Sequence, residues 1–110
     1  MRNYTPSQLE INAMRQELAA NGFTSFMRKM KECTNKPTID IIKVISAETG
    51  VKRDDIRSWK HQGVCNGACA NVLCGLAEES GFYFGKHMLV PTKAVCEQWL
   101  EHERHNFSGK

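Results

Sequence analysis

Residues 38–61, TIDIIKVISAETGVKRDDIRSWKH, decide how the rest of the chain is interpreted. Apolar residues recur at helical spacing on both sides of Gly50, so two short helices can share one buried seam across a tight turn. Glycine suits this turn because it adopts a positive φ without a Cβ clash. The stretch therefore predicts two helices joined at Gly50, with these residues in the seam: Ile41, Ile42, Ile45, Val51, Ile56 and Trp59.

The pattern ISAETGV from Ile45 to Val51, followed by Ile56 and Trp59, resembles the helix-turn-helix of Cro-like and lambda repressor-like regulators of phage and bacteria. It includes a small residue, Ser46, four positions before the glycine, where the two helices of that family cross closely. The second helix of such a pair enters the major groove. The resemblance implies a sequence-specific DNA-binding transcriptional regulator, of the phage or mobile-element repressor type. The alternative is a plain helical corner, which occurs in many all-α proteins.

The polar side of the second helix carries the candidate DNA-binding residues. The two arginines of this set can each donate to both major-groove acceptors of guanine, and the aspartate can accept from cytosine N4. The lysines and the histidine are better suited to phosphates. The alternative for each is an exposed side chain in solvent, and for the aspartate and its neighbour Asp55 we favour helix capping over base recognition. The set comprises Lys52, Arg53, Asp54, Arg57, Ser58, Lys60 and His61.

Length and composition describe one soluble domain. The chain has 110 residues, 41% of them hydrophobic and 25% charged, which argues against disorder and against a large enzyme fold. A net charge of +3 permits a nucleic-acid partner without requiring one. Because the sequence contains no apolar run long enough to span a membrane and no apolar signal-peptide core, we expect a cytoplasmic protein without a membrane partner.

Three further helices are expected around the central pair, making an all-α domain of about five helices. Residues 6–21 form an amphipathic pattern that Gly22 ends, and a second pattern runs from residue 23 to about 34. Thr38 is the expected cap of the next helix, and Asn66 is the expected cap of the last, which ends near Gly81. By the family resemblance, the amide end of the helix that starts at Thr38 also contacts the DNA backbone.

The end of the chain has a different composition. Aromatic and apolar residues flank Gly85 and Lys86 and predict a small hairpin, after which Pro91 and Thr92 begin another helix. We therefore divide the chain into a DNA-binding domain, a C-terminal hairpin and helix, and a flexible tail, at residues 1–81, 82–105 and 106–110. The apolar residues of 82–100 either cover the helical core or hold a second copy. The resemblance favours a homodimer, because such regulators read two half-sites.

Five cysteines without a secretion signal are expected to be reduced thiols. Cys65 and Cys69 are four apart, so both would face one side of a helix, and His61 could approach them across the turn at Gly63. Cys74 lies five residues beyond Cys69, which departs from the spacing of structural zinc ligands. We favour buried thiols over zinc binding or redox sensing, and expect no metal or cofactor.

Catalysis has little support in the sequence, and we expect no enzyme. Cys96 and His102 are a candidate nucleophile and base, but they fall on one short helix without a third orienting group. The remaining functional class is a protein–protein interaction module, an antirepressor or adaptor built on the same helices. The acidic pair, the mild net charge and the apolar C-terminal segment favour it, and a regulatory protein partner is compatible with either class.

Overall fold

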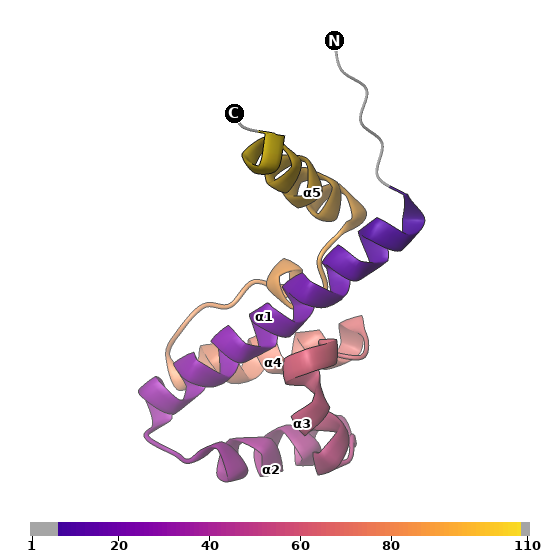
Figure 1. Cartoon of the computed structure of the whole chain (residues 1–110). Coiled ribbons are helices and arrows are strands. Elements are labelled where there is room, and N and C mark those ends of the chain that lie inside the picture. Colours follow the sequence, from indigo (N-terminus) through magenta and orange to yellow (C-terminus); the bar gives the residue numbers. More distant parts are fainter. Residues whose placement is uncertain (1–6, 109–110) are drawn as a thin grey trace.

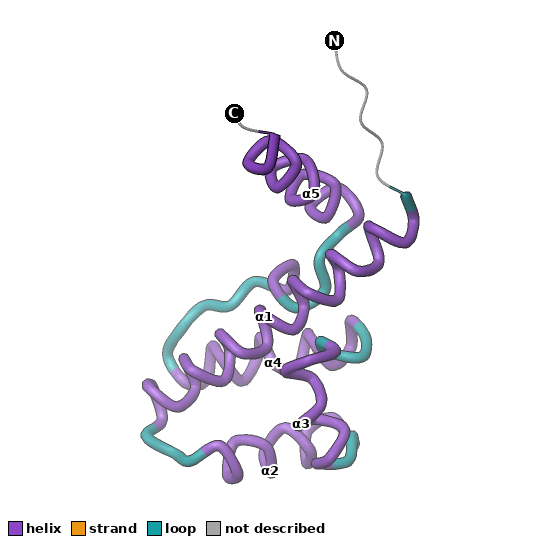
Figure 2. The backbone as a smooth tube through the Cα atoms, in the orientation of Figure 1, coloured by secondary structure: helices purple, strands orange, loops and turns teal. Residues whose placement is uncertain are grey.

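The computed structural model describes residues 7–108, with only the backbone described from 104 onward. Within these residues every regular element is helical, which confirms the all-α fold of about five helices (Figures 1 and 2). No helix in this range is long and apolar enough to cross a bilayer. The elements, in chain order, are α1 (Gln8–Thr34), α2 (Thr38–Thr49), α3 (Arg53–Gln62), α4 (Gly67–Ser80), the short 3₁₀ helix η1 (Lys86–Met88) and α5 (Lys93–Ser108).

α1 is one continuous helix, so the prediction that Gly22 ends a first helix and residue 23 begins a second is wrong. The helix starts with a capping box, in which Ser7 Oγ accepts from the Glu10 amide at 3.2 Å and Glu10 Oε1 accepts from the Ser7 amide at 2.9 Å. Gly22 is buried inside α1, where a Cβ would collide with the Met88 carbonyl oxygen. The glycine allows a close approach of backbone rather than a helix end.

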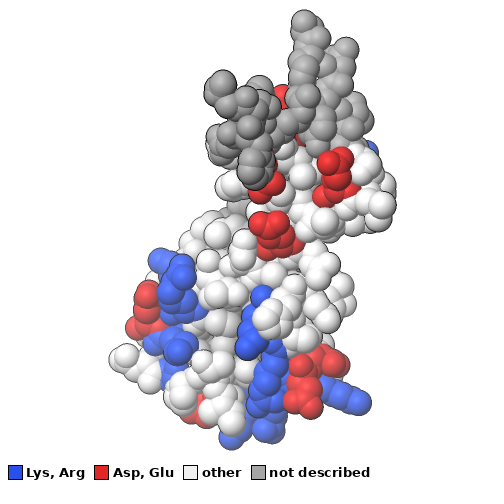
Figure 3. Space-filling model, viewed as in Figure 1, with Lys and Arg blue, Asp and Glu red and all other residues white. Residues whose placement is uncertain are grey.

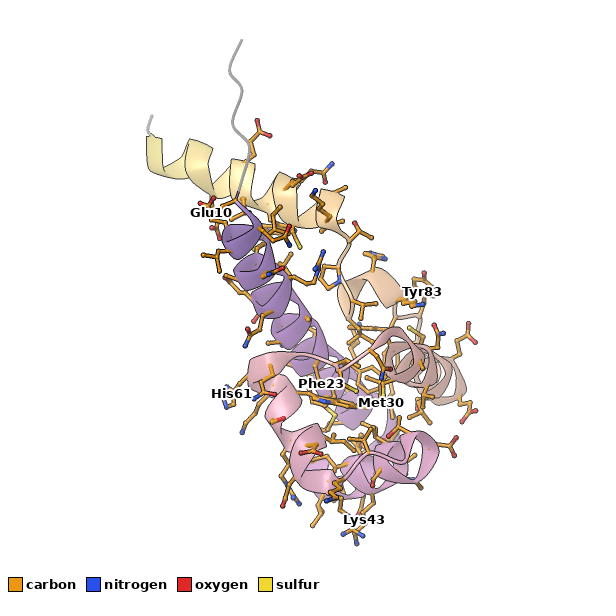
Figure 4. The ribbon with its side chains drawn as sticks, turned by 90° about the vertical axis from the view of Figure 1, so that its right-hand side faces the viewer. Glu10, Phe23, Met30, Lys43, His61 and Tyr83 are labelled. Carbon is orange, nitrogen blue, oxygen red and sulfur yellow. The ribbon has the colours of Figure 1, made fainter. Side chains whose placement is uncertain are left out.

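The main core lies between the second half of α1 and helices α2, α3 and α4. Phe26, Ile45 and Leu73 are fully buried there, and the Phe23 ring meets the Trp59 ring edge to face with centroids 5.5 Å apart. Figure 4 shows Phe23 and Met30 pointing from α1 into this core. Burial of this many large apolar side chains is the dominant favourable contribution to folding. α1 is the central element, because it contacts every other helix.

Residues 82–90 pack on this core and form no hairpin, which corrects the prediction. Gly85 has φ −76°, whereas a two-residue type I′ turn needs positive φ at both central positions. Phe84 is instead buried against Phe26, with ring centroids 5.6 Å apart, and Leu89 is fully buried after η1. Phe82 and Phe84 therefore pack on the helical core without a partner strand, whereas Tyr83 is exposed.

α5 lies beside the first half of α1, far from α2 and α3 (Figure 1). It begins after Pro91 and Thr92, as expected, with Thr92 Oγ1 accepting from the Val95 amide at 3.2 Å. It reaches Ser108, so residues 106–108 of the expected flexible tail are helical, while 109–110 lie outside the described residues. α1 and α5 share a second, small core, and we call these two paired segments the arm. Its buried members are Ile11, Met14 and Cys96, with Leu18 and Leu100 beside them.

Candidate nucleic-acid interface

The turn between α2 and α3 is built as the sequence predicts. Gly50 has φ 77°, and its amide donates to the Ser46 carbonyl at 2.9 Å. Ser46 Oγ donates to the Val51 carbonyl at 2.7 Å, so this small residue also bonds directly across the turn. One net hydrogen bond of this kind contributes about 1 kcal/mol. The turn therefore holds α2 and α3 in a defined relative orientation.

α3 is anchored on one side only. Ile56 and Trp59 are its buried residues, and both belong to the main core between α1, α2 and α4. At its end, the Gly63 amide donates to the Trp59 carbonyl at 2.8 Å, and Gly63 itself packs against Ala19 of α1. The opposite side of the helix is left for solvent or a partner. This is the arrangement that a recognition helix requires, because the groove must be entered by a helix face that the core does not use.

The structure places the predicted site residues together on this outer side. Figure 4 shows His61 at the end of α3, pointing away from the core that holds Phe23. Ser58 is half-buried, and its hydroxyl donates to the Asp55 carbonyl at 2.6 Å, so its proton is engaged within the helix. The other six residues of the set are exposed: Lys52, Arg53, Asp54, Arg57, Lys60 and His61.

Asp54 forms an ion pair with Arg57 one turn further along α3. Arg57 Nη1 lies 2.8 Å from Asp54 Oδ1, and the two side chains are 47% and 94% exposed. An exposed pair of this kind contributes about 0.5 kcal/mol or less, whereas a bidentate arginine–guanine contact provides about 1–3 kcal/mol of discrimination. A guanine edge can therefore displace Asp54 from Arg57. The expected capping by Asp54 is limited to its charge near the amino end of α3, because its carboxylate is directed to Arg57.

The amino end of α2 lies next to α3 and forms part of a hollow of about 420 Å³. Pro37, not Thr38, stands at the cap position, so the predicted cap is shifted by one residue, and proline has no side-chain acceptor to offer. The hollow has an apolar floor with two cations of α3 at its edge. Its lining consists of Phe23, Thr24, Met27, Thr38, Ile42, Arg57 and Lys60. Thr38 at the amino end of α2 and these two cations therefore line one space.

Sequence reasoning missed this hollow, because it needs three helices to meet. Thr24 and Met27 lie on α1, far from the motif in sequence, and nothing in their local pattern distinguishes them from other positions of an amphipathic helix. The nearest available signal is the spacing of Phe23 and Met27, which predicts only that both face the same way. The crossing of α1 over α2 and α3 supplies the rest.

Positive charge is concentrated around α2 and α3. Residues 23–62 contain nine Lys or Arg and five Asp or Glu, whereas the remainder of the chain contains six and seven. Figure 3 shows Lys and Arg side chains gathered over the lower part of this face, where the second half of α1, α2 and α3 lie. The mild net charge of the whole chain therefore averages over a basic region, residues 23–62, which includes the exposed Arg28, Lys29 and Lys31 of α1.

The cysteines divide between core and surface. Cys69 is buried and Cys74 half-buried, in keeping with the expected buried thiols, and burial raises the pKa of both. Cys65 is exposed, which corrects that expectation, and it precedes α4 rather than sharing the helix with Cys69. In the described part of the chain, no three His, Cys, Asp or Glu residues are grouped so that they could hold a metal ion.

The candidate nucleophile and base of α5 are placed in different surroundings. Cys96 is fully buried with Ile11 and Met14 in the arm. His102 packs edge to face against Trp99, with ring centroids 5.9 Å apart. The geometry gives the arm a packing role.

No protein-family model matches this sequence, and neither a curated protein nor a solved structure matches it. The geometry of α2, α3 and their surroundings, together with the resemblance carried by residues 38–61, is therefore the basis for assigning a function.

Proposed function

We propose that this protein is a sequence-specific regulator of transcription that binds double-stranded DNA, acts in the cytoplasm and reads the major groove with α3. The observation that supports this most is the one-sided anchoring of α3, whose buried Ile56 and Trp59 leave a row of charged and polar groups on the other face. The major groove is about 12 Å wide and admits such a helix. By the resemblance of residues 38–61, a phage or mobile-element repressor is the proposed type.

The side-chain chemistry of the α3 residues decides which of them contact bases and which contact phosphates. Arg53 and Arg57 recognise guanine through paired donation, and Asp54 is free to accept from cytosine N4 once Arg57 has turned to a base. The row Arg53, Arg57 and Lys60 follows a spacing of four and three residues, which keeps all three on one face of the helix. Lys52, Lys60 and His61 hold phosphates at the two ends of the helix. Ser58, whose proton is donated to the Asp55 carbonyl, can accept from a base amino group.

A phosphate fits the hollow at the amino end of α2. The first amides of a helix point outward with the positive end of its dipole, which favours an anion. Lys60 and Arg57 lie on the rim of the same hollow. This contact carries no sequence information, but it positions the protein so that α3 meets the bases at a fixed depth.

Two copies of the chain are proposed to act together. One short recognition helix offers few base contacts, and repressor-like proteins double them by binding two half-sites about one helical turn apart. The segment 82–100 is the proposed contact. Within this segment Phe84, Leu89 and Cys96 are buried in the chain, while Met88 and Trp99 are 41% and 47% exposed, so we propose that these two side chains contribute to the contact.

A protein–protein interaction module, an antirepressor or adaptor, is the second candidate. Two observations favour it: Asp54 pairs with the arginine that would otherwise read DNA, and large apolar side chains are exposed outside the motif. Leu9, on α1, and Tyr83 are the clearest examples, at 81% and 80% exposed. Such residues are common at protein interfaces. This candidate uses the same fold without the arginines of α3.

Charge reversal on α3 separates the two candidates. We expect Arg53→Glu combined with Arg57→Glu to abolish specific DNA binding in a gel-shift assay, because two base contacts and two favourable charges are lost together. Lys93→Glu is the control, since Lys93 is also exposed but lies on α5. If the double variant bound DNA as tightly as the control while losing a protein partner, the regulator proposal would be wrong.

A further inference from the structure

Cys65 and Cys69 lie together at the start of α4, directly after the helix-turn-helix. Cys65 precedes the helix cap, Asn66, and Cys69 follows in the first turn. Their Sγ atoms are 3.4 Å apart. A disulfide has an S–S distance near 2.05 Å, so the two sulfurs need to approach by about 1.4 Å, which is within the reach of side-chain rotation. The pair is therefore placed to form a disulfide. No such contact is shown for the other cysteines of the described residues.

The two thiols differ in access to solvent. Cys65 is exposed and forms part of the wall of a hollow of about 520 Å³ between α1 and the segment before α5, with Arg15 and Gln16 among its neighbours. Cys69, in contrast, is buried. Oxidation of thiols follows access and thiolate character, so a small oxidant in solvent meets Cys65 first.

Burial also keeps the Cys69 thiol protonated. Burial raises the pKa of Cys69 to about 11, and its contact with Cys65 adds to the rise. Cys69 is therefore a neutral thiol at physiological pH, able to direct its proton toward the Cys65 sulfur. This is the arrangement of an outer thiol that reacts and an inner thiol that resolves the product.

We propose that Cys65 and Cys69 are an oxidisable pair that hydrogen peroxide converts to an intramolecular disulfide. In the first step the Cys65 sulfur attacks one peroxide oxygen, the O–O bond breaks, and the departing hydroxide takes the thiol proton and leaves as water. The product is a sulfenic acid at Cys65. In the second step the Cys69 sulfur attacks the Cys65 sulfur, the S–O bond breaks, and hydroxide leaves as water with the Cys69 proton. Two thiols lose two electrons and two protons, and one peroxide gains them.

The disulfide would connect the linker after α3 to the first turn of α4. Asn66 already ties these parts together, because its Oδ1 accepts from the Cys69 amide at 2.8 Å. The linker also holds Gly63 and Val64, both buried against the core. Oxidation therefore adds a covalent bond to a connection that the fold has already made, and needs no opening of the core.

Mass spectrometry of the full-length protein tests the proposal. Trypsin releases the peptide 61–86, which contains Cys74 as well as the pair, so the experiment uses Cys74→Ser, whose peptide 61–86 carries only the two proposed thiols. After equimolar hydrogen peroxide and then blocking with N-ethylmaleimide in denaturant, which exposes Cys69, we expect this peptide to carry no maleimide and to have lost about 2 Da, the mass of two hydrogen atoms. Dithiothreitol before blocking should restore two maleimide additions.

Single variants assign the two roles. In Cys69→Ser, a sulfenic acid at Cys65 has no resolving thiol and should be trapped by dimedone. In Cys65→Ser, Cys69 should stay reduced and react with maleimide only after unfolding. Cys33→Ser is the matched control, because Cys33 is also exposed but lies on α1, and it should leave the disulfide unchanged. Sulfinic acid at Cys65 without a disulfide, or a disulfide between two chains as the main product, would overturn the proposal.

Discussion

Two glycines position the elements around α3 for different physical reasons. Gly50 adopts a positive φ that few other residues tolerate, and its place just after a run of helical apolar residues makes it predictable from the sequence. Gly22 is needed for the space beside it, which the Met88 backbone fills. Met88 is remote in sequence, so no local pattern could reveal this contact. From the sequence alone, a glycine within a helical pattern is therefore interpreted as a helix end, because the remote residue that packs against it is not known.

Gly22→Ala is expected to destabilise the protein despite the higher helix propensity of alanine. Crowding in a packed interior costs about 1–3 kcal/mol, against at most about 1 kcal/mol gained from replacing a helical glycine. Gly75→Ala is the matched control, because Gly75 lies within α4 and a Cβ there meets nothing within 4 Å. Urea unfolding should show a lower midpoint for the first variant and an unchanged or higher midpoint for the second. Equal midpoints would contradict the packing role of Gly22.

At the scale of elements, the sequence predicts what is local. The turn of α2 and α3 and the start of α4 follow their caps, since glycine and Asn66 act through nearby backbone groups. The exposed set on α3 was also predictable, because Ile56 and Trp59 define its buried side. The supposed hairpin failed because Phe84 packs on Phe26, a contact that strand patterns do not describe. The hollow beside α2 could not be predicted from the sequence for the same reason, because three elements form it.

Lys60 tests the role of that hollow. Lys60→Ala should weaken binding to all duplexes to a similar degree, and the slope of log affinity against log salt should become shallower by about one, as expected for the loss of a single phosphate contact. Fluorescence anisotropy at several salt concentrations measures both quantities. Lys93→Ala, on α5, should leave the slope unchanged. A Lys60 variant that lost affinity for one sequence alone would show a base contact in place of the phosphate contact.

The whole molecule is elongated, with extents of 49 × 23 × 18 Å, and its two ends differ. The basic helix pair lies at one end and the arm at the other (Figures 1 and 3). The arm has a small core of its own, and Trp99 leaves about half of its surface uncovered. Two helices with so few buried residues gain stability when another pair covers their open face, as in helix bundles. Contact between two copies through η1 and α5 would leave both copies of α3 free for DNA.

Negative charge at the exposed Met88 and Trp99 should dissociate the proposed dimer. We expect the wild-type protein to sediment as a dimer at tens of micromolar, and Met88→Glu with Trp99→Glu to sediment as a monomer, because the carboxylates would be buried in the contact. Ile39→Glu is the control: Ile39 is similarly exposed, but it lies on α2 outside the proposed contact, and its variant should remain dimeric. A monomeric wild-type chain, or a dimer in the double variant, would place the interface elsewhere.

Selection of bound duplexes from a random pool tests the central claim, that α3 reads DNA sequence, most directly. The full-length protein should enrich one motif at physiological salt, arranged as two inverted half-sites whose centres lie about 10 base pairs apart. The motif should be lost when the selection is repeated with Arg53→Glu and Arg57→Glu, and kept with Lys93→Glu. Binding that shows no enriched sequence and disappears as salt is raised would contradict the account, because it would leave only non-specific attraction between the basic helices and phosphate.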